Sequence, residues 1–216
     1  MCSPGSTSRE RSGYWARPPC LPASSPRCWW SSPRAQATCA DLGLCREDIR
    51  AGLRYGLVAS ALILLGLVVT AVIPATNRFF HDSRAEIGGG RLLYELTVSI
   101  VLVTVIPEEF AFRGVLLGSA VRLWGRWRAS SVSSALFGLW HIAPTLHTMS
   151  DNRVTSGASG TAGEQVLLIL GAIATTFVAG LVFAWLRLRS QSLIASILAH
   201  AATNGLTLGI AWIILR

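Results

Sequence analysis

The sequence predicts an all-α, multi-pass transmembrane helical bundle, and two observations carry this prediction. Of the 216 residues, 51% are hydrophobic and only 14% are charged, a composition typical of multi-span membrane proteins. The apolar residues also gather into long segments separated by polar stretches. A chain of this length suits one membrane domain without a large soluble domain.

The first part of the chain does not follow this pattern. Residues 1–40 are rich in Ser, Pro, Arg and Cys and show neither helical nor strand periodicity. They also lack the continuous apolar core of a signal peptide. We therefore expect a disordered or non-native leader, followed by a membrane domain over residues 41–216 that opens with an amphipathic, interface-lying stretch.

Five apolar segments are each expected to form a helix: 55–74, 92–120, 130–147, 165–186 and 192–215. The first, fourth and fifth have the roughly 20 residues that a helix needs to cross the hydrocarbon core. The second is long enough to tilt, or to kink at Pro107, and the third is short. The prediction is therefore about five spans.

The basic residues orient these spans. With a cytoplasmic N-terminus, eight arginines fall in inside loops and four in outside loops, which follows the positive-inside rule. The inside set is Arg46, Arg50, Arg54, Arg122, Arg126, Arg128, Arg187 and Arg189, and the outside set is Arg78, Arg84, Arg91 and Arg153. Span-flanking arginines explain the net charge of +8 better than nucleic-acid binding, because no basic-aromatic module is present. We expect a bacterial plasma membrane.

Cysteine chemistry is not expected in the membrane region. All five cysteines precede the first apolar segment, without CxxC spacing or an accompanying histidine pair. We therefore expect neither a disulfide nor a metal site among them, and no thiol nucleophile within the spans.

The second apolar segment carries charges, although a charge at the bilayer centre costs on the order of 2.5–3.5 kcal/mol. At about 1.5 Å of rise per residue, Glu108 and Glu109 lie roughly 17–18 Å from the cytoplasmic end of their helix, and Arg113 roughly 10 Å. His141 on the third segment and Asn204 on the fifth lie roughly 15 and 16 Å deep. Ionisable and polar groups from three helices thus reach a common layer.

Helical spacing groups these side chains further. Three pairs are four residues apart and share a helix face: Glu109 with Arg113, Phe137 with His141, and His200 with Asn204. We expect Glu109 to pair with Arg113, and His200 and Asn204 to point into one cavity. Each pair alone could also be a packing contact between helices. Their convergence favours a functional site.

Together these groups fit hydrolysis of an acyl bond by an activated water. Glu108 would be the general base, a histidine would hold the water or act as general acid, and a His/Asn pair would donate to an oxyanion. A two-aspartate protease is excluded, because Asp82 and Asp151 both lie in loops, and no HExxH zinc motif is present. The GASG stretch resembles a serine elbow, but Ser159 lies in an outside loop at the wrong depth for His200.

The motifs EEFAFRG, FGLWH and HAATN resemble the EExxxR, FxxxH and HxxxN motifs of the CPBP family of intramembrane proteases, the CAAX-processing type II and Abi group. The resemblance implies a glutamate-dependent endopeptidase whose cavity faces the cytoplasm. Glu108 and His141 would activate water, and His200 and Asn204 would contact the oxyanion. It implies no obligatory cofactor, but leaves open a divalent metal such as zinc on Glu108, His141 and His200.

One departure concerns the N-terminal side, where family members usually carry further spans and this chain has its irregular leader. The expected reaction is cleavage of a peptide bond in a membrane-associated or lipidated, CAAX-like protein or peptide. The partners are then the lipid bilayer and that substrate. The alternative is a non-catalytic membrane scaffold or immunity-type protein that retains the polar cluster. A small transporter is less favoured, because the sequence has no inverted repeat.

Overall fold

The computed structural model describes residues 38–148 and 161–216, which are helical and contain no strand. The predicted all-α class is confirmed. Of the leader expected over residues 1–40, residues 1–37 lie outside the described part of the chain. The described helices belong to one unit, Gln36–Arg216. Three helical stretches are long and apolar enough to cross a membrane: Cys39–Val72, Ala162–Ser190 and Leu193–Ile214.

The second expected span is helical but changes its winding three times. It begins as α4 (Gly89–Tyr94), becomes π-helical in η4 (Glu95–Val105), returns to α5 (Ile106–Glu109) and is again π-helical in η5 (Phe110–Leu116). Pro107, which has no N–H to donate, lies at the start of α5. The two glutamates therefore follow this proline, in the single α-helical turn between two wider stretches.

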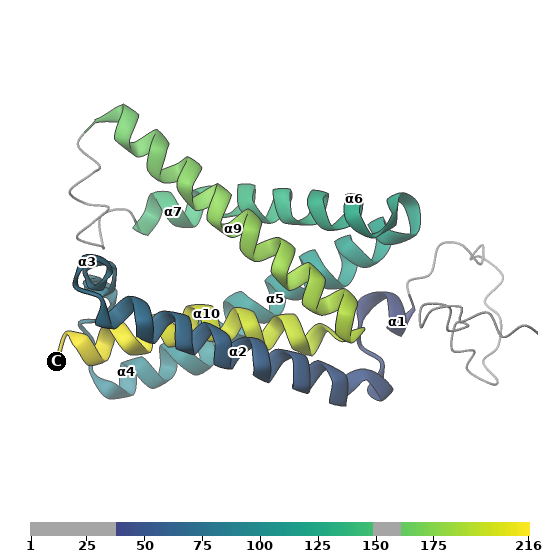
Figure 1. Cartoon of the computed structure of the whole chain (residues 1–216), viewed down its shortest axis with the longest axis horizontal. Coiled ribbons are helices and arrows are strands. Elements are labelled where there is room, and N and C mark those ends of the chain that lie inside the picture. Colours follow the sequence, from purple (N-terminus) through teal and green to yellow (C-terminus); the bar gives the residue numbers. More distant parts are fainter. Residues whose placement is uncertain (1–37, 149–160) are drawn as a thin grey trace, which may run out of the picture. The chain divides into compact units, whose positions relative to one another are not determined.

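The third expected span occupies the second half of α6 (Leu117–Trp140) and continues as α7 (Ile142–Thr148). Within α6, Gly125 has φ 74° and ψ 171°, a conformation that favours glycine, and the chain reverses there (Figure 1). The reversal falls in the stretch that the arginine pattern assigns to an inside loop.

Small residues let two pairs of helices approach closely. α2 (Ile49–Val72) packs against α10 (Leu193–Ile214), where a Cβ on Gly56 would lie 3.2 Å from the Ala195 Cα. α6 packs against α9 (Ala162–Ser190), where a Cβ on Gly138 would lie 2.9 Å from the Ile173 carbonyl oxygen. Figure 1 shows α2 and α10 side by side. Such close approach is how membrane helices gain packing energy without a hydrophobic drive between them.

The N-terminal turn α1 (Cys39–Leu42) is fixed by a capping box between Thr38 and Asp41 and ends at Gly43 in the left-handed conformation. Because Gly43 turns the chain back, the Cα atoms of Cys39 and Cys45 lie 5.3 Å apart and the two residues form a disulfide. The expectation that these cysteines form no disulfide is therefore wrong, since CxxC spacing is not needed where a turn brings more distant cysteines together.

The remaining short elements connect the long helices. The turn η1 (Arg46–Asp48) leads into α2, and α3 (Pro74–Asn77), η2 (Arg78–Phe80) and η3 (Ser83–Ala85) lead from α2 to α4. Both η2 and η3 contact α10. A buried apolar cluster made by Phe137, Phe183, Leu186, Ala195 and Ala199 lies where α6, α9 and α10 meet. The polar groups of the three motifs lie against this cluster.

Candidate active site

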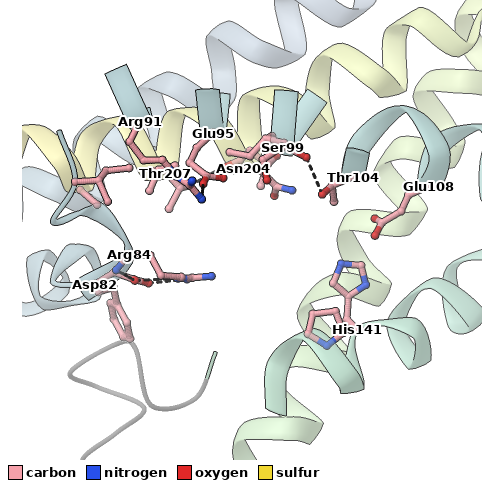
Figure 2. A pocket seen from close by; sticks show the side chains of 17 residues that line it. Asp82, Arg84, Arg91, Glu95, Ser99, Thr104, Glu108, His141, Asn204 and Thr207 are labelled. Carbon is pink, nitrogen blue, oxygen red and sulfur yellow. Dashed lines mark hydrogen bonds and ion pairs between the residues drawn. The ribbon is translucent and has the colours of Figure 1, made fainter. Parts of the chain in front are cut away.

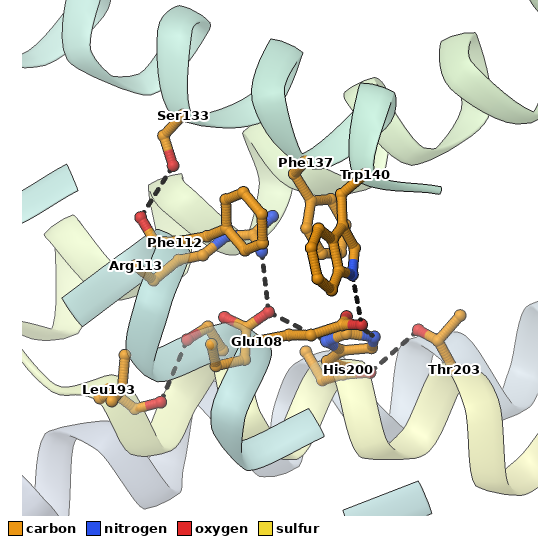
Figure 3. A network of polar contacts seen from close by, with 12 residues as sticks. Glu108, Phe112, Arg113, Ser133, Phe137, Trp140, Leu193, His200 and Thr203 are labelled. Carbon is orange, nitrogen blue, oxygen red and sulfur yellow. Dashed lines mark hydrogen bonds and ion pairs between the residues drawn. The ribbon is translucent and has the colours of Figure 1, made fainter. Parts of the chain in front are cut away.

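The structure brings the residues of all three motifs together. Glu108 and Glu109 come from α5, and Arg113 follows on η5. Phe137 lies in the last turn of α6, His141 is the C-cap of that helix, and the third motif lies on α10. Figure 3 shows the contacts between these helices.

Glu109 and Arg113 form the expected ion pair, with Arg113 Nη1 donating to Glu109 Oε1 at 3.0 Å. Both side chains are completely buried. The Arg113 guanidinium also lies over the Phe137 ring, with Cζ 3.9 Å from its centroid. The charge of Glu109 is thus paired within its own helix, and this carboxylate has no access to the solvent.

His200 contacts both glutamates. Its Nδ1 lies 3.0 Å from Glu109 Oε1, the oxygen that also accepts from Arg113, and its Nε2 lies 4.0 Å from Glu108 Oε2. An ionised carboxylate can only accept, so Nδ1 carries the hydrogen. The ring stacks on Phe183, with centroids 5.1 Å apart. His200 is therefore held in one orientation, with Nε2 directed at Glu108.

Glu108 has a different environment from Glu109. Its Oε1 accepts a hydrogen bond from Trp140 Nε1 at 2.9 Å. Its Oε2 is buried and has no hydrogen-bond partner among residues 38–148 and 161–216. The carboxylate is therefore oriented through Oε1, while Oε2 faces His200 and makes no hydrogen bond to the described residues.

His141 is oriented by its own helix. Its Nδ1 lies 2.8 Å from the backbone oxygen of Phe137, and a carbonyl oxygen can only accept, so the hydrogen is on Nδ1. The ring also packs edge-on against Phe137, with centroids 4.4 Å apart, as the shared helix face predicts. In the neutral ring Nε2 is then a hydrogen-bond acceptor.

Glu108, His141 and Asn204 line one cavity of about 690 Å³. In Figure 2 the Glu108 carboxylate and the His141 ring face each other at one end of this cavity. Its other lining residues include Ser99, Thr104, Thr203 and Thr207, and at the far end Asp82, Arg84, Arg91 and Glu95. His200 and Asn204 were expected to point into one cavity. Asn204 lines this cavity, but His200 is not among the lining residues.

The far end of the cavity bears on orientation. It lies at Arg84 and Arg91, which the arginine pattern assigns to the outside. The arginines assigned to the inside gather at the opposite end, where Arg122 and Arg187 both bind Asp41. The arginine pattern thus assigns the far end of this cavity to the outer side of the membrane. The family resemblance instead implies a cavity that faces the cytoplasm, so the two expectations disagree.

The three candidate metal ligands do not form a compact set. Glu108, His141 and His200 do not bring their ligand atoms within 4.8 Å of one another, whereas among the described residues Cys45, Glu47 and Asp48 do. Cys45 is in a disulfide, however, and a metal binds the thiolate rather than the disulfide.

One contact in the site has no counterpart in the three motifs. Trp140 precedes His141 directly, and its bond to Glu108 joins residues 32 positions apart in the sequence. In the sequence, only the position of Trp140 beside a motif histidine indicated a role in the site. The hydroxyl residues lining the cavity carried no signal at all, because threonine and serine are common in membrane helices.

This geometry can be compared with known proteins. A family model described as type II CAAX prenyl endopeptidase Rce1-like matches residues 91–206, more than half of the chain. The chain belongs to this family. The match covers all three motifs, and the resemblance to CAAX-processing type II proteases is confirmed at the level of the family. No curated protein and no solved structure matches the chain. At family level, the Rce1-like chain is a membrane peptidase.

Proposed function

We propose that this chain is a glutamate-dependent intramembrane endopeptidase acting on a membrane-associated or lipidated, CAAX-like protein or peptide. One observation carries the proposal. Glu108 lines the cavity beside His141, with one carboxylate oxygen held by Trp140 and the other without a hydrogen-bond partner among the described residues. An oriented carboxylate with a free acceptor is what a general base requires.

The proposed reaction begins with a water between Glu108 and His141. The water gives a proton to the Glu108 carboxylate while its oxygen bonds to the carbonyl carbon of the substrate. His141, whose Nδ1–H is engaged by the Phe137 carbonyl, accepts a hydrogen bond at Nε2 from the second O–H of the water, and this hydrogen stays on the oxygen that becomes part of the product carboxyl group. The carbonyl π electrons move to the oxygen. When they return, the C–N bond breaks and the leaving amine takes the proton from Glu108.

Asn204 is the proposed donor to the oxyanion, because its side chain lines the cavity that holds Glu108. An amide placed before the reaction can stabilise developing charge without reorganising. His200 would act differently from the oxyanion role that the family resemblance suggests. With Nδ1–H donated to Glu109 and Nε2 4.0 Å from Glu108, its ring would pack beside the base without a hydrogen bond to it, held in place by the buried Arg113–Glu109 pair.

The direct test compares cleavage of a panel of farnesylated C-terminal peptides by membranes containing wild type, Glu108→Gln or Glu86→Gln. Glu86 is an exposed glutamate that does not line the cavity, so it controls for loss of a carboxylate. Loss of a general base lowers the rate about 10²–10⁴-fold. We expect that loss in Glu108→Gln alone. Equal cleavage by all three proteins would reject Glu108 as the base. If folded wild type cleaves no peptide in the panel, the scaffold alternative is favoured.

A further inference from the structure

The cavity at the candidate active site extends well beyond the reacting groups. Glu108 and His141 lie at one end, and Arg91 and Glu95 lie at the other (Figure 2). The proposed hydrolysis uses only the end at Glu108. The rest of the cavity is therefore available to the part of the substrate on one side of the scissile bond, an inference that rests on the proposed function.

The length of this cavity can be estimated from the helix that forms one of its walls. Glu95 and Glu108 are 13 residues apart on η4 and α5, which corresponds to about 20 Å at the rise of an α-helix. An extended peptide advances about 3.3 Å per residue, so about six residues span this length. At the spacings of strands and sheets an extended residue fills about 150 Å³, so the 690 Å³ of the cavity holds between about four and five. The two estimates agree on four to six extended residues.

Polar side chains line most of the cavity. Of the 17 lining residues, 11 are polar or charged, whereas pockets for apolar ligands are lined mainly by hydrophobic side chains. At the far end the side chains of Arg84 and Arg91 are 54% and 63% exposed, and each forms an ion pair with a nearby carboxylate. Exposed ion pairs belong in solvent or among headgroups rather than in hydrocarbon. The cavity therefore suits a peptide better than a prenyl or acyl chain.

Threonine hydroxyls give the lining its hydrogen-bonding character. Thr104 Oγ1 donates to the backbone oxygen of Ser99 at 3.0 Å. Thr203 and Thr207 on α10 donate to the backbone oxygens four residues before them, at 2.9 and 2.6 Å. Each hydroxyl hydrogen is thus used within its own helix, and the oxygen keeps a lone pair that can accept. Backbone N–H groups of a substrate are matching donors.

The spacing of two of these hydroxyls matches an extended chain. Thr203 and Thr207 are one turn apart on α10, a rise of about 6 Å. In an extended peptide, N–H groups on the same side recur every second residue, about 6.6 Å apart. The two threonines can therefore accept from alternate residues of one extended segment.

We propose that the cavity binds four to six extended residues of an unlipidated peptide segment next to the scissile bond, with Thr203 and Thr207 accepting hydrogen bonds from its backbone. Both threonines are then specificity-determining residues. Because every residue except proline offers a backbone N–H, they select an extended backbone rather than particular side chains. A lipid anchor on the substrate would stay outside the cavity, in the bilayer.

The test measures kcat and KM for peptide cleavage by the full chain in membranes. Each farnesylated peptide of the panel is paired with the same sequence carrying serine in place of the farnesylated cysteine. In both forms the flank on either side of the scissile bond is varied in separate series, with one, three, six or eight residues. The series on wild type tests the inference without any substitution in the protein.

The same peptides are given to Thr207→Val and Thr175→Val. Thr175 is the matched control, because its hydroxyl also donates to the backbone oxygen four residues before it, but the residue is exposed on α9 and does not line the cavity. The melting temperature of each variant shows whether it folds.

We expect the serine and farnesylated forms to be cleaved equally well, and kcat/KM to rise with the length of one flank up to about six residues. Thr207→Val should raise KM about fivefold for the longer peptides, the effect of one neutral hydrogen bond, and leave kcat unchanged. Peptides with one residue on that flank should not distinguish it from wild type. Thr175→Val should match wild type throughout.

A requirement for the farnesyl group would overturn the inference and leave the proposed function intact. Full cleavage of peptides with one residue on both flanks would do the same, as would equal KM for the two folded variants. Cleavage of no peptide in either form would reject the proposed function and the inference with it.

Discussion

Glu108 and Glu109 are adjacent in the sequence, yet their surroundings give them different tasks. Glu109 is completely buried and holds Arg113 and His200 through one oxygen. Glu108 contacts Trp140 and lines the cavity. Successive residues on a helix point about 100° apart, so one carboxylate faces the bundle interior and the other faces the cavity. The proposed base is therefore Glu108, and Glu109 is a positioning residue.

Trp140 is expected to act as a second positioning residue. Trp140→Phe keeps the ring but removes the N–H that binds Glu108, so the carboxylate loses its fixed orientation. We predict that kcat falls about tenfold, the effect of one hydrogen bond to a charged group. KM and the melting temperature should change little, since Trp140 is 57% exposed.

The matched control for this prediction is Trp127→Phe, a tryptophan on the same helix that is 88% exposed and does not line the cavity. It should leave kcat unchanged. Equal kcat for wild type and Trp140→Phe would show that the contact has no part in the reaction.

Among the elements, α5 sets the position of the glutamates, and the contact of α6 with α9 sets the position of His141. π-helical turns occur often at functional sites, and here they lie on both sides of α5. The α6–α9 contact depends on Gly138, three residues before His141 and against the Ile173 carbonyl. Loss of this close approach would displace the end of α6 that carries Phe137 and His141.

Gly138→Ala is predicted to destabilise the fold by about 1–3 kcal/mol, because the new Cβ would lie 2.9 Å from a backbone oxygen that cannot move alone. Gly171→Ala on α9 is the control, since its Cβ would meet nothing within 4 Å. It should stabilise the helix by up to about 1 kcal/mol. Thermal unfolding in detergent measures both changes. A Gly138→Ala protein as stable as the control would mean that the two helices pack less closely.

At the scale of the whole molecule, the direction of the cavity decides which side of the membrane supplies substrate. The positive-inside rule assigns the end with Arg122 and Arg187 to the cytoplasm. The cavity extends from Glu108 to Asp82 and Arg84 at the other end. We therefore predict that the cavity opens to the outer side, against the expectation of a cytoplasmic cavity, and the substrate would then be a membrane-associated protein or peptide on that side.

Cysteine labelling in intact cells tests this orientation. In a background with the five native cysteines replaced by serine, Ser83→Cys should react with an impermeant maleimide, and Arg128→Cys should react only after lysis. Both positions are exposed. The reverse pattern would place the cavity end in the cytoplasm and would support a CAAX-like substrate on that side.

Much of the site was predictable because its chemistry is local in the sequence. The Glu109–Arg113 pair and the Phe137–His141 contact both follow from four-residue spacing on a helix. The Trp140–Glu108 hydrogen bond could not be predicted in this way, because it depends on how α6 packs against η5, the stretch that follows the glutamates.

The long helices of the fold were also predictable from the sequence, but their internal winding and the N-terminal turn were not. Apolar length predicted α2, α9 and α10, but not the π-helical winding of the second segment, which no hydropathy pattern encodes. The Cys39–Cys45 disulfide was missed because it depends on the turn at Gly43.

The central claim is that Glu108 and His141 activate one water. The most direct measurement is a double-mutant cycle on kcat for peptide cleavage, with wild type, Glu108→Gln, His141→Gln and the double variant, each with and without a chelator. Residues that act as a unit are not additive, so the double variant should be no slower than the slower single variant. Chelator should leave wild type active. Additive losses, or loss of wild-type cleavage in chelator, would contradict the account.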